Sequence, residues 1–148
     1  DFILDLEFKI KKKGNSGVFL RVGDPKGQVK TGFEVQILDG RNTETYTSHG
    51  DVFAIHGATM KPDRPHPKGA QRCLPSERRC KPAGQWNHYR VVCNDGVLKL
   101  AVNGKVVSGG SGCTPRKGYI CLESEGSPVE FRNIRIKRLG STETSGAE

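Results

Sequence analysis

The sequence predicts an all-β fold, a single antiparallel β-sandwich or jelly roll, and three observations support this fold class. Apolar and polar residues alternate with a period of two in several short segments, as half-buried strands do. Most of these segments end at turns rich in glycine, asparagine or aspartate. No segment of convincing length has the 3.6-residue period of a helix. Many short antiparallel strands with little helix are typical of sandwiches and jelly rolls.

The N-terminal part of the chain contains three predicted strands. Residues 2–10 alternate between apolar and charged side chains and end at the turn around Gly14. The next two strands are predicted over residues 18–22 and 32–38, on either side of a glycine-rich turn region. A sheet therefore begins to form early in the chain.

The middle of the chain is predicted to be an antiparallel meander. Its strands cover residues 89–93, 97–102 and 105–107. The last two of them are joined by Asn103-Gly104, a strong signal for a type I′ hairpin turn.

The final strand carries two apolar pairs that are out of phase with each other. Val129 and Phe131 keep one phase of the two-residue period, and Ile134 and Ile136 take the other. A β-bulge at residues 132–133 would let both pairs face the core. The domain is predicted to span residues 1–139, and the polar tail 140–148 is predicted to be disordered.

A further strand begins at residue 119 and places two acidic side chains on one face. Glu123 and Glu125 share this face, whereas Ile120 and Leu122 point the other way. Neighbouring carboxylates repel each other, so such a pair usually has a cation, a proton or a ligand between its members. A solvated edge of the sheet is the alternative interpretation.

The segment 56–85 interrupts the strand pattern with five prolines and no periodicity that predicts a regular element. A loop of this length in a compact domain is usually functional or disordered, and its content favours a functional loop. Its polar side chains able to bind or protonate a ligand are those of His56, Arg64, His66, Arg72 and Glu77. A flexible surface insertion is the alternative. Trp86, directly after this loop, is predicted to be a core anchor, with stacking on a sugar ring as the other possibility.

The net charge of +8 raises the question of a nucleic-acid partner, but the sequence favours none. The basic residues are spread over several elements, and no aromatic-interleaved basic strip or nucleic-acid motif accompanies them. The densest basic run, residues 9–13, is interpreted as a solvated hairpin tip. No apolar run approaches the length of a membrane span.

The five cysteines fit neither a zinc-knuckle spacing nor a redox CxxC motif. Cys73 and Cys80 can close a short loop, whereas Cys93 and Cys121 lie in strand patterns and are expected to be buried thiols. Because the number is odd, at least one cysteine lacks an intramolecular partner. This usage favours, weakly, a periplasmic or extracellular location.

Four blocks spread over nearly the whole chain resemble the 3-keto-disaccharide hydrolase domain family, in the order in which that family has them. They are NSGVFLR (15–21), GFEVQILD (32–39), KPAGQWNHYR (81–90) and VEFRNIRI (129–136). The resemblance implies a sandwich of the concanavalin A-like lectin and glucanase type, usually in secreted or periplasmic bacterial proteins that act on oxidised glycosides. It also implies that the first strand of the family is missing from this chain.

The family often has a Leu-Gln-x-His-Gly stretch where this chain has Leu122-Glu123-Ser124-Glu125-Gly126. Catalysis in this chain is therefore expected to use carboxylates or the histidines of the long loop. A ketone at C3 of a sugar acidifies the proton on C2, so the reaction implied by the resemblance needs a base over C2. It also needs a positive group for the developing oxyanion and an acid near the leaving oxygen.

We predict Glu34 or Glu125 as the base, Arg21 as the electrostatic clamp, and His56 or His66 as the acid. A cross-strand salt bridge between Arg21 and Glu34 is the alternative interpretation of these two residues. The side chains predicted to bind the sugar are those of Gln36, Glu123, Arg64, His66 and Arg72. No cofactor is required by any spacing, although a divalent metal ion could be held by the three glutamates at positions 34, 123 and 125.

The predicted function is the cleavage of 3-keto-sugar glycosides, with an oligosaccharide or glycoside as ligand. Two alternatives stay open at this stage. One is a non-catalytic carbohydrate-binding module of a longer secreted protein, and the other is an adhesion domain with a lectin-like sandwich.

Overall fold

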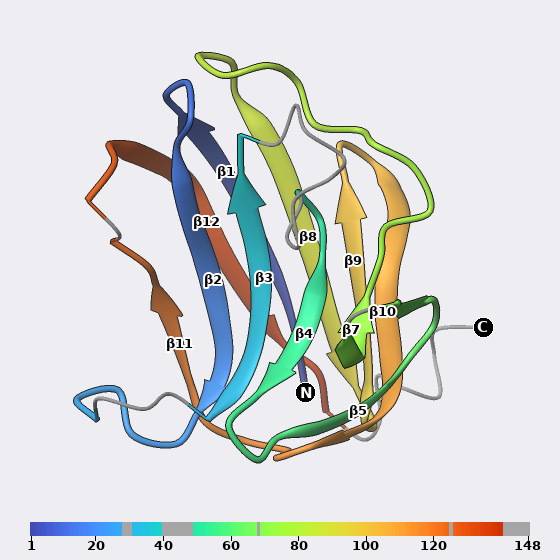
Figure 1. Cartoon of the computed structure of the whole chain (residues 1–148). Helices are drawn as coiled ribbons and strands as arrows, with labels where there is room; N and C mark the ends of the chain where they lie inside the picture. The colour runs from blue at the N-terminus through green and yellow to red at the C-terminus, as the bar shows by residue number, and fades with distance from the viewer. Residues whose placement is uncertain (28–30, 40–48, 68, 125, 141–148) are drawn as a thin grey trace.

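The structure of the protein, a computed structural model, describes residues 1–27, 31–39, 49–67, 69–124 and 126–140. These residues form two six-stranded antiparallel sheets that pack face to face, and the described part of the chain contains no helix (Figure 1). The predicted all-β sandwich is thereby confirmed. The predicted disordered tail lies outside the described residues from position 141 onward.

Sheet A has the strand order β12-β1-β8-β9-β10-β5. Its strands are β1 (Phe2–Ile10), β5 (Thr59–Pro62), β8 (Asn87–Asn94), β9 (Val97–Val102), β10 (Lys105–Thr114) and β12 (Val129–Arg138). Consecutive strands β8, β9 and β10 are neighbours, so the predicted meander is confirmed. Asn103 and Gly104 both have positive φ, 48° and 91°, as a type I′ turn requires.

Sheet B has the order β11-β2-β3-β4-β7-β6. Its strands are β2 (Asn15–Val22), β3 (Gly32–Leu38), β4 (Val52–Ile55), β6 (Pro65–His66), β7 (Gly69–Cys73) and β11 (Tyr119–Leu122). Figure 1 shows β2, β3 and β4 running side by side in front of sheet A.

The core lies between the two sheets and consists of the inward side chains of the alternating strands. Strand β1 contributes Leu4, Leu6, Phe8 and Ile10, and strand β3 contributes Phe33, Val35 and Ile37, all of them buried. Tyr89 spans the interior and donates its hydroxyl proton to the carbonyl of Gln36 at 2.8 Å. Since successive strand residues point to opposite faces, this buried set leaves the residues between its members on the outer faces.

The expectation that segment 56–85 lacks regular elements is wrong. It contains three short strands, of which β5 joins sheet A beside β10, and β6 and β7 join sheet B. The chain therefore crosses from one sheet to the other and back within this segment. Backbone pairing orders these short strands, of β5 with β10, of β7 with β4 and of β6 with β7, and their own side-chain pattern does not predict it.

The predicted bulge in the last strand is present, but its expected effect on burial is only partly correct. The register between β1 and β12 shifts between Asp5 and Glu7, and Asn133 takes a positive φ of 52°. Val129 and Phe131 pack against the core as expected. Ile134 and Ile136 are 52% and 57% exposed, because β12 is an edge strand that sheet B does not fully cover.

The cysteines and Trp86 differ in part from expectation. All five cysteines are free thiols, so the bridge considered between Cys73 and Cys80 is not formed. Cys93 is buried as expected, whereas Cys121 is only partly buried. Trp86 lies outside the core and contacts the cations of Lys9 and Arg132, whose centres are 5.0 and 3.7 Å from its ring centroid.

In the described residues no helix has the length and apolar character needed to cross a membrane.

Candidate functional site

The outer face of sheet B carries a group of polar side chains on adjacent strands. Because Phe33, Val35 and Ile37 are buried in the core, Glu34 and Gln36 lie on the opposite face of β3. Antiparallel pairing places Glu34 opposite Phe19 of β2 and Gln36 opposite Gly17. The register thus sets an acid, an amide, an aromatic ring and a glycine next to one another.

Gly17 lies beside two carboxylates that come from distant parts of the sequence. A Cβ placed on Gly17 would lie 2.8 Å from Oε1 of Glu34 and 2.9 Å from Oε2 of Glu123. Glu123 follows β11 directly, and its backbone N–H donates to the carbonyl of Gly17 at 3.0 Å. The missing side chain of Gly17 therefore lets both carboxylate groups approach the backbone of β2 closely.

Hydrogen bonds hold the side chain of Gln36 and the segment after β11 in place on this face. The Nε2 of Gln36 donates to Oδ1 of Asn15 at 2.9 Å, and Gln36 is only 4% exposed. The backbone N–H of Asn15 donates to Oγ of Ser127 at 3.0 Å, and this hydroxyl donates to the Asn15 carbonyl at 3.1 Å. The chain after β11 is thus held against the start of β2, next to the two carboxylates.

Arg72, a buried cation, lies on the same face of sheet B, two strands away from Glu34. Phe53 of β4 pairs with Glu34 on one side and with Arg72 of β7 on the other. The Nε of Arg72 donates to Oδ2 of Asp51 at 2.9 Å, and the guanidinium carbon lies 4.2 Å from the Phe53 ring centroid. The Arg72 and Asp51 side chains are 4% and 1% exposed. Loss of one partner of such a buried ion pair destabilises a fold by about 3–5 kcal/mol.

Four residues predicted to belong to the site therefore share one face of sheet B. They are Glu34, Gln36, Glu123 and Arg72. Glu125, predicted as the alternative base, lies outside the described residues. The roles assigned to all five stay predictions.

Arg21, predicted as the electrostatic clamp, does not lie on this face. Its φ of 56° breaks the strand alternation, and the register between β2 and β11 shifts at the same place. The side chain is 3% exposed, and its Nη1 and Nη2 donate to the Pro115 carbonyl at 3.3 Å and to Oδ1 of Asp1 at 3.4 Å. The alternative of a salt bridge from Arg21 to Glu34 is replaced by this bridge to Asp1.

The remaining predicted residues lie toward the far edge of sheet B. His56 is exposed in the turn after β4 with a φ of 48°, and its carbonyl accepts a hydrogen bond from Thr31. Arg64 is exposed and donates to the Leu74 carbonyl at 3.0 Å. His66 lies on β6, the outermost strand, three strands away from β3. None of these contacts brings the three side chains to the carboxylates.

Sequence reasoning missed three residues of this face. Gly17 and Asn15 belong to the block NSGVFLR. A single glycine and a single asparagine do not indicate a functional site when no sequence motif relates them to other polar residues. Asp51 precedes a four-residue strand and shows no pattern that relates it to Arg72. A glycine in the middle of a predicted strand is the one available signal, since it marks a close approach of other groups.

The sequence leaves open a divalent metal ion held by the glutamates at positions 34, 123 and 125. Among the described residues no group of three or more His, Cys, Asp or Glu side chains is arranged to hold a metal ion. Glu34 and Glu123 are two oxygen donors, and the third predicted donor, Glu125, is not described.

The two packed antiparallel sheets define the protein as a β-sandwich domain. Within this class the chain belongs to the 3-keto-alpha-glucoside-1,2-lyase-like domain family, whose model matches residues 1–137. The family resemblance predicted from the four sequence blocks is thereby confirmed.

Solved structures share this architecture at low sequence identity. Two structures of candidate glycosyl hydrolases from Parabacteroides distasonis have TM-scores of 0.66 with 26% and 24% identity. The chain is covered to 93% and 94% in these matches, and it spans 78% and 72% of those proteins. The carbohydrate-binding module CBM66 from Bacillus subtilis has a TM-score of 0.62 at 12% identity, with 93% and 75% of the two chains covered. The comparison with curated proteins found no match.

Proposed function

We propose that the domain cleaves glycosides of 3-keto sugars by elimination, and that the carboxylates beside Gly17 carry out the proton transfers. The observation that carries this proposal is that the carboxylates of Glu34 and Glu123 both lie against Gly17. Membership of the 3-keto-alpha-glucoside-1,2-lyase-like family supports the substrate class.

The proposed reaction needs one group that removes a proton and one that delivers a proton. A base takes the proton from C2, and the electron pair of that C–H bond forms an enolate with the C3 carbonyl. The enolate then restores the C3 ketone and forms the C1=C2 double bond as the C1–O bond breaks. The departing oxygen receives a proton from the acid, which releases the aglycone. Water then adds its oxygen to C1 and a proton to C2, which gives the free 3-keto sugar. Two neighbouring carboxylates, one ionised and one protonated, can perform these transfers.

We assign the base to Glu34 and the acid to Glu123. Glu34 lies on the central strand β3, whose pairing with β2 and β4 holds its backbone in place, and this rigid position supports its assignment as the base. Glu123 directly follows β11, the edge strand of sheet B, and its backbone hydrogen bond to Gly17 holds it beside Glu34.

Arg72 is the cation that we assign to the C3 oxygen. It takes over the role predicted for Arg21, which is bound elsewhere. Arg72 lies in the same cross-strand row as Glu34, and the buried carboxylate of Asp51 fixes its orientation. A preorganised positive charge on this face lowers the energy of the enolate that forms when C2 loses its proton. Gln36, held by Asn15, is assigned to a sugar hydroxyl.

Replacing the C2 hydrogen of the substrate with deuterium tests this mechanism. A 3-keto-glucoside with a chromogenic aglycone, its C2-deuterated form and the unoxidised glucoside are incubated with the protein, and aglycone release is followed. We expect release from the ketone, slower release from the deuterated form, and none from the unoxidised glucoside. Equal rates for the ketone and the unoxidised glucoside would contradict elimination, because only the ketone acidifies C2.

A non-catalytic carbohydrate-binding module is the second candidate function. It is favoured by the overall similarity to CBM66 and by the family's histidine, which is a glutamate at position 125 in this chain. Saturable sugar binding without any aglycone release by the wild type would favour this candidate. For either function we propose a periplasmic or extracellular location, as the family resemblance implies.

A further inference from the structure

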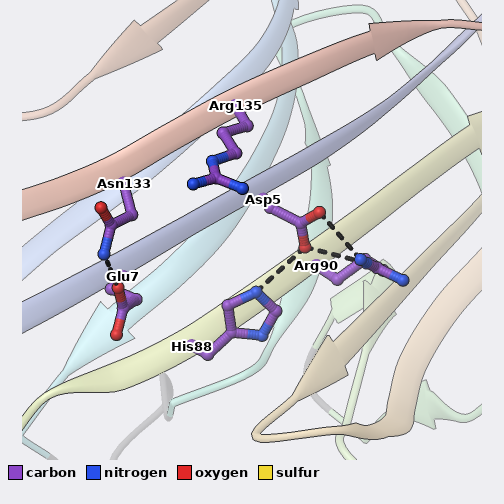
Figure 2. A pocket seen from close by; sticks show the side chains of 6 residues that line it. All are labelled: Asp5, Glu7, His88, Arg90, Asn133 and Arg135. Atoms are coloured by element: carbon purple, nitrogen blue, oxygen red, sulfur yellow. Dashed lines mark hydrogen bonds and ion pairs between the residues drawn. The ribbon is translucent and has the colours of Figure 1, made fainter.

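A second polar site lies on the outer face of sheet A, on the opposite side of the sandwich from the carboxylates beside Gly17. It is a hollow of about 330 Å³ on strands β1, β8 and β12 (Figure 2). Its lining consists of Asp5, Glu7, His88, Arg90, Asn133 and Arg135. Pockets for small organic ligands begin at about 300 Å³, so the hollow has room for a single sugar unit.

Asp5 anchors one side of the hollow. Arg90 donates to both of its oxygens, from Nε to Oδ1 at 2.8 Å and from Nη2 to Oδ2 at 2.9 Å. Nε2 of His88 lies 3.0 Å from Oδ1 of the same carboxylate. The hydrogen bond from Arg90 is the main cause that lowers the pKa of Asp5, so this carboxylate is ionised at neutral pH.

Glu7 anchors the other side. Asn133 donates its side-chain N–H to Oε2 of Glu7, and Nη2 of Arg132 donates to Oε1 at 3.3 Å. The bulge gives Asn133 its positive φ and directs its amide at Glu7. These two donors, Asn133 first, hold the pKa of Glu7 below its ordinary value.

Arg135 is the surplus cation of this hollow. Asp5 and Glu7 form ion pairs with Arg90 and Arg132, whereas the side chain of Arg135 makes no hydrogen bond or ion pair within the described part of the chain. It faces Asp5 in the strand register. Figure 2 shows its guanidinium extending from β12 over β1, with Asp5 and Arg90 on one side and the Glu7–Asn133 pair on the other.

We propose that this hollow binds a sugar acid, a saccharide unit that carries one carboxylate. The planar guanidinium of Arg135 presents a fork of N–H donors that matches a carboxylate. The ionised Asp5 and Glu7 accept hydrogen bonds from sugar hydroxyl groups, while they repel a bare inorganic anion. A ligand with one negative group and several hydroxyl donors fits both halves of the lining.

The test is a titration of the ¹⁵N-labelled protein with glucuronate, glucose or sodium sulfate, followed by the amide signals of β1, β8 and β12. The variants are Arg135→Gln and Arg135→Lys. The matched control is Arg138→Gln, which removes the same charge from an exposed position three residues further along β12. The spectra of the free variants report whether the fold is retained.

We expect glucuronate to shift the signals of the hollow and the Arg135→Gln variant to bind it at least about tenfold more weakly. The Arg135→Lys variant should fall between the two, because lysine keeps the charge but loses the two-pronged contact. The Arg138→Gln variant should bind within about twofold of the wild type.

Three results would overturn the proposal. Unchanged glucuronate binding by Arg135→Gln would show that Arg135 does not hold the carboxylate. Glucose that binds as tightly as glucuronate would show that the carboxylate is not recognised, and sulfate that does so would reduce the hollow to a site for any anion.

Discussion

The proposed active site depends on a glycine at position 17. No strained backbone angle requires glycine at this position, since its φ is not in the left-handed region. What excludes a larger residue is the pair of carboxylate oxygens within 2.9 Å of the position that a Cβ would take. A small change at position 17 therefore probes the geometry of two distant residues at once.

The Gly17→Ala variant is expected to lose aglycone release by roughly tenfold to a hundredfold, because the displaced carboxylates no longer meet C2 and the leaving oxygen. Its free energy of unfolding should change by less than about 1 kcal/mol, since the groups that must move are the ends of flexible side chains. Release rates and urea unfolding of both proteins measure these effects. The control is Gly23→Ala, where a Cβ meets no atom within 4 Å. Full activity of Gly17→Ala would argue against this site.

Individual residues also show why the site could be predicted only in part. Glu34 and Gln36 follow from regular alternation in β3, because nothing interrupts that strand. The position of Arg21 could not be predicted, because its left-handed backbone conformation turns the side chain away from the face that carries Glu34. An arginine rarely adopts this conformation, so the sequence does not indicate it. Asp51 and Arg72 come together through the pairing of β4 with β7, and this pairing has no signature in either segment.

At the scale of elements, the junction of β3 and β4 contains a histidine that the proposed chemistry does not use. Nδ1 of His49 accepts a hydrogen bond from the backbone N–H of Leu38 at 3.1 Å, and its ring stacks on Phe8 with centroids 5.9 Å apart. Burial is the main cause that lowers the pKa of His49 from 6.5 to about 4. The folded protein thus keeps this imidazole neutral at pH values where the unfolded chain protonates it.

This histidine predicts a loss of stability on acidification. Between pH 6.5 and about 4 the unfolded state binds a proton that the folded state does not, so the His49 contribution is complete above pH 6.5 and declines below it. We expect a decline on the order of 2 kcal/mol, measured by urea unfolding across this range. The His49→Gln variant keeps an acceptor for Leu38 and should lack this decline. Parallel pH profiles of the two proteins would contradict the assignment.

The strands themselves were predicted with uneven success, for a physical reason. β1, β3, β8 and β9 each bury one face against the core, so their sequences alternate and their positions follow directly. β5, β6 and β7 are two to five residues long, too short for alternation to show, although Met60 and Cys73 reach the core. Segment 56–85 therefore reads as a loop although it supplies the strand that carries Arg72.

At the scale of the whole molecule, the sandwich keeps its two polar outer faces apart. One face carries the carboxylates beside Gly17, and the other carries the hollow with Arg135. The shared core of both sheets lies between them, so a substitution in one site should leave the other intact. The net charge of +8 favours the approach of anionic ligands to either face.

The measurement that tests the central claim most directly is aglycone release from a 3-keto-glucoside by the wild type, Glu34→Gln and Glu123→Gln. The matched control is Glu130→Gln, an exposed glutamate of sheet A that pairs with Lys9. We expect release by the wild type and the control, and a loss of at least about a hundredfold in each of the other two variants, because each lacks one proton-transfer group. Wild-type rates in both Glu34→Gln and Glu123→Gln would contradict the account.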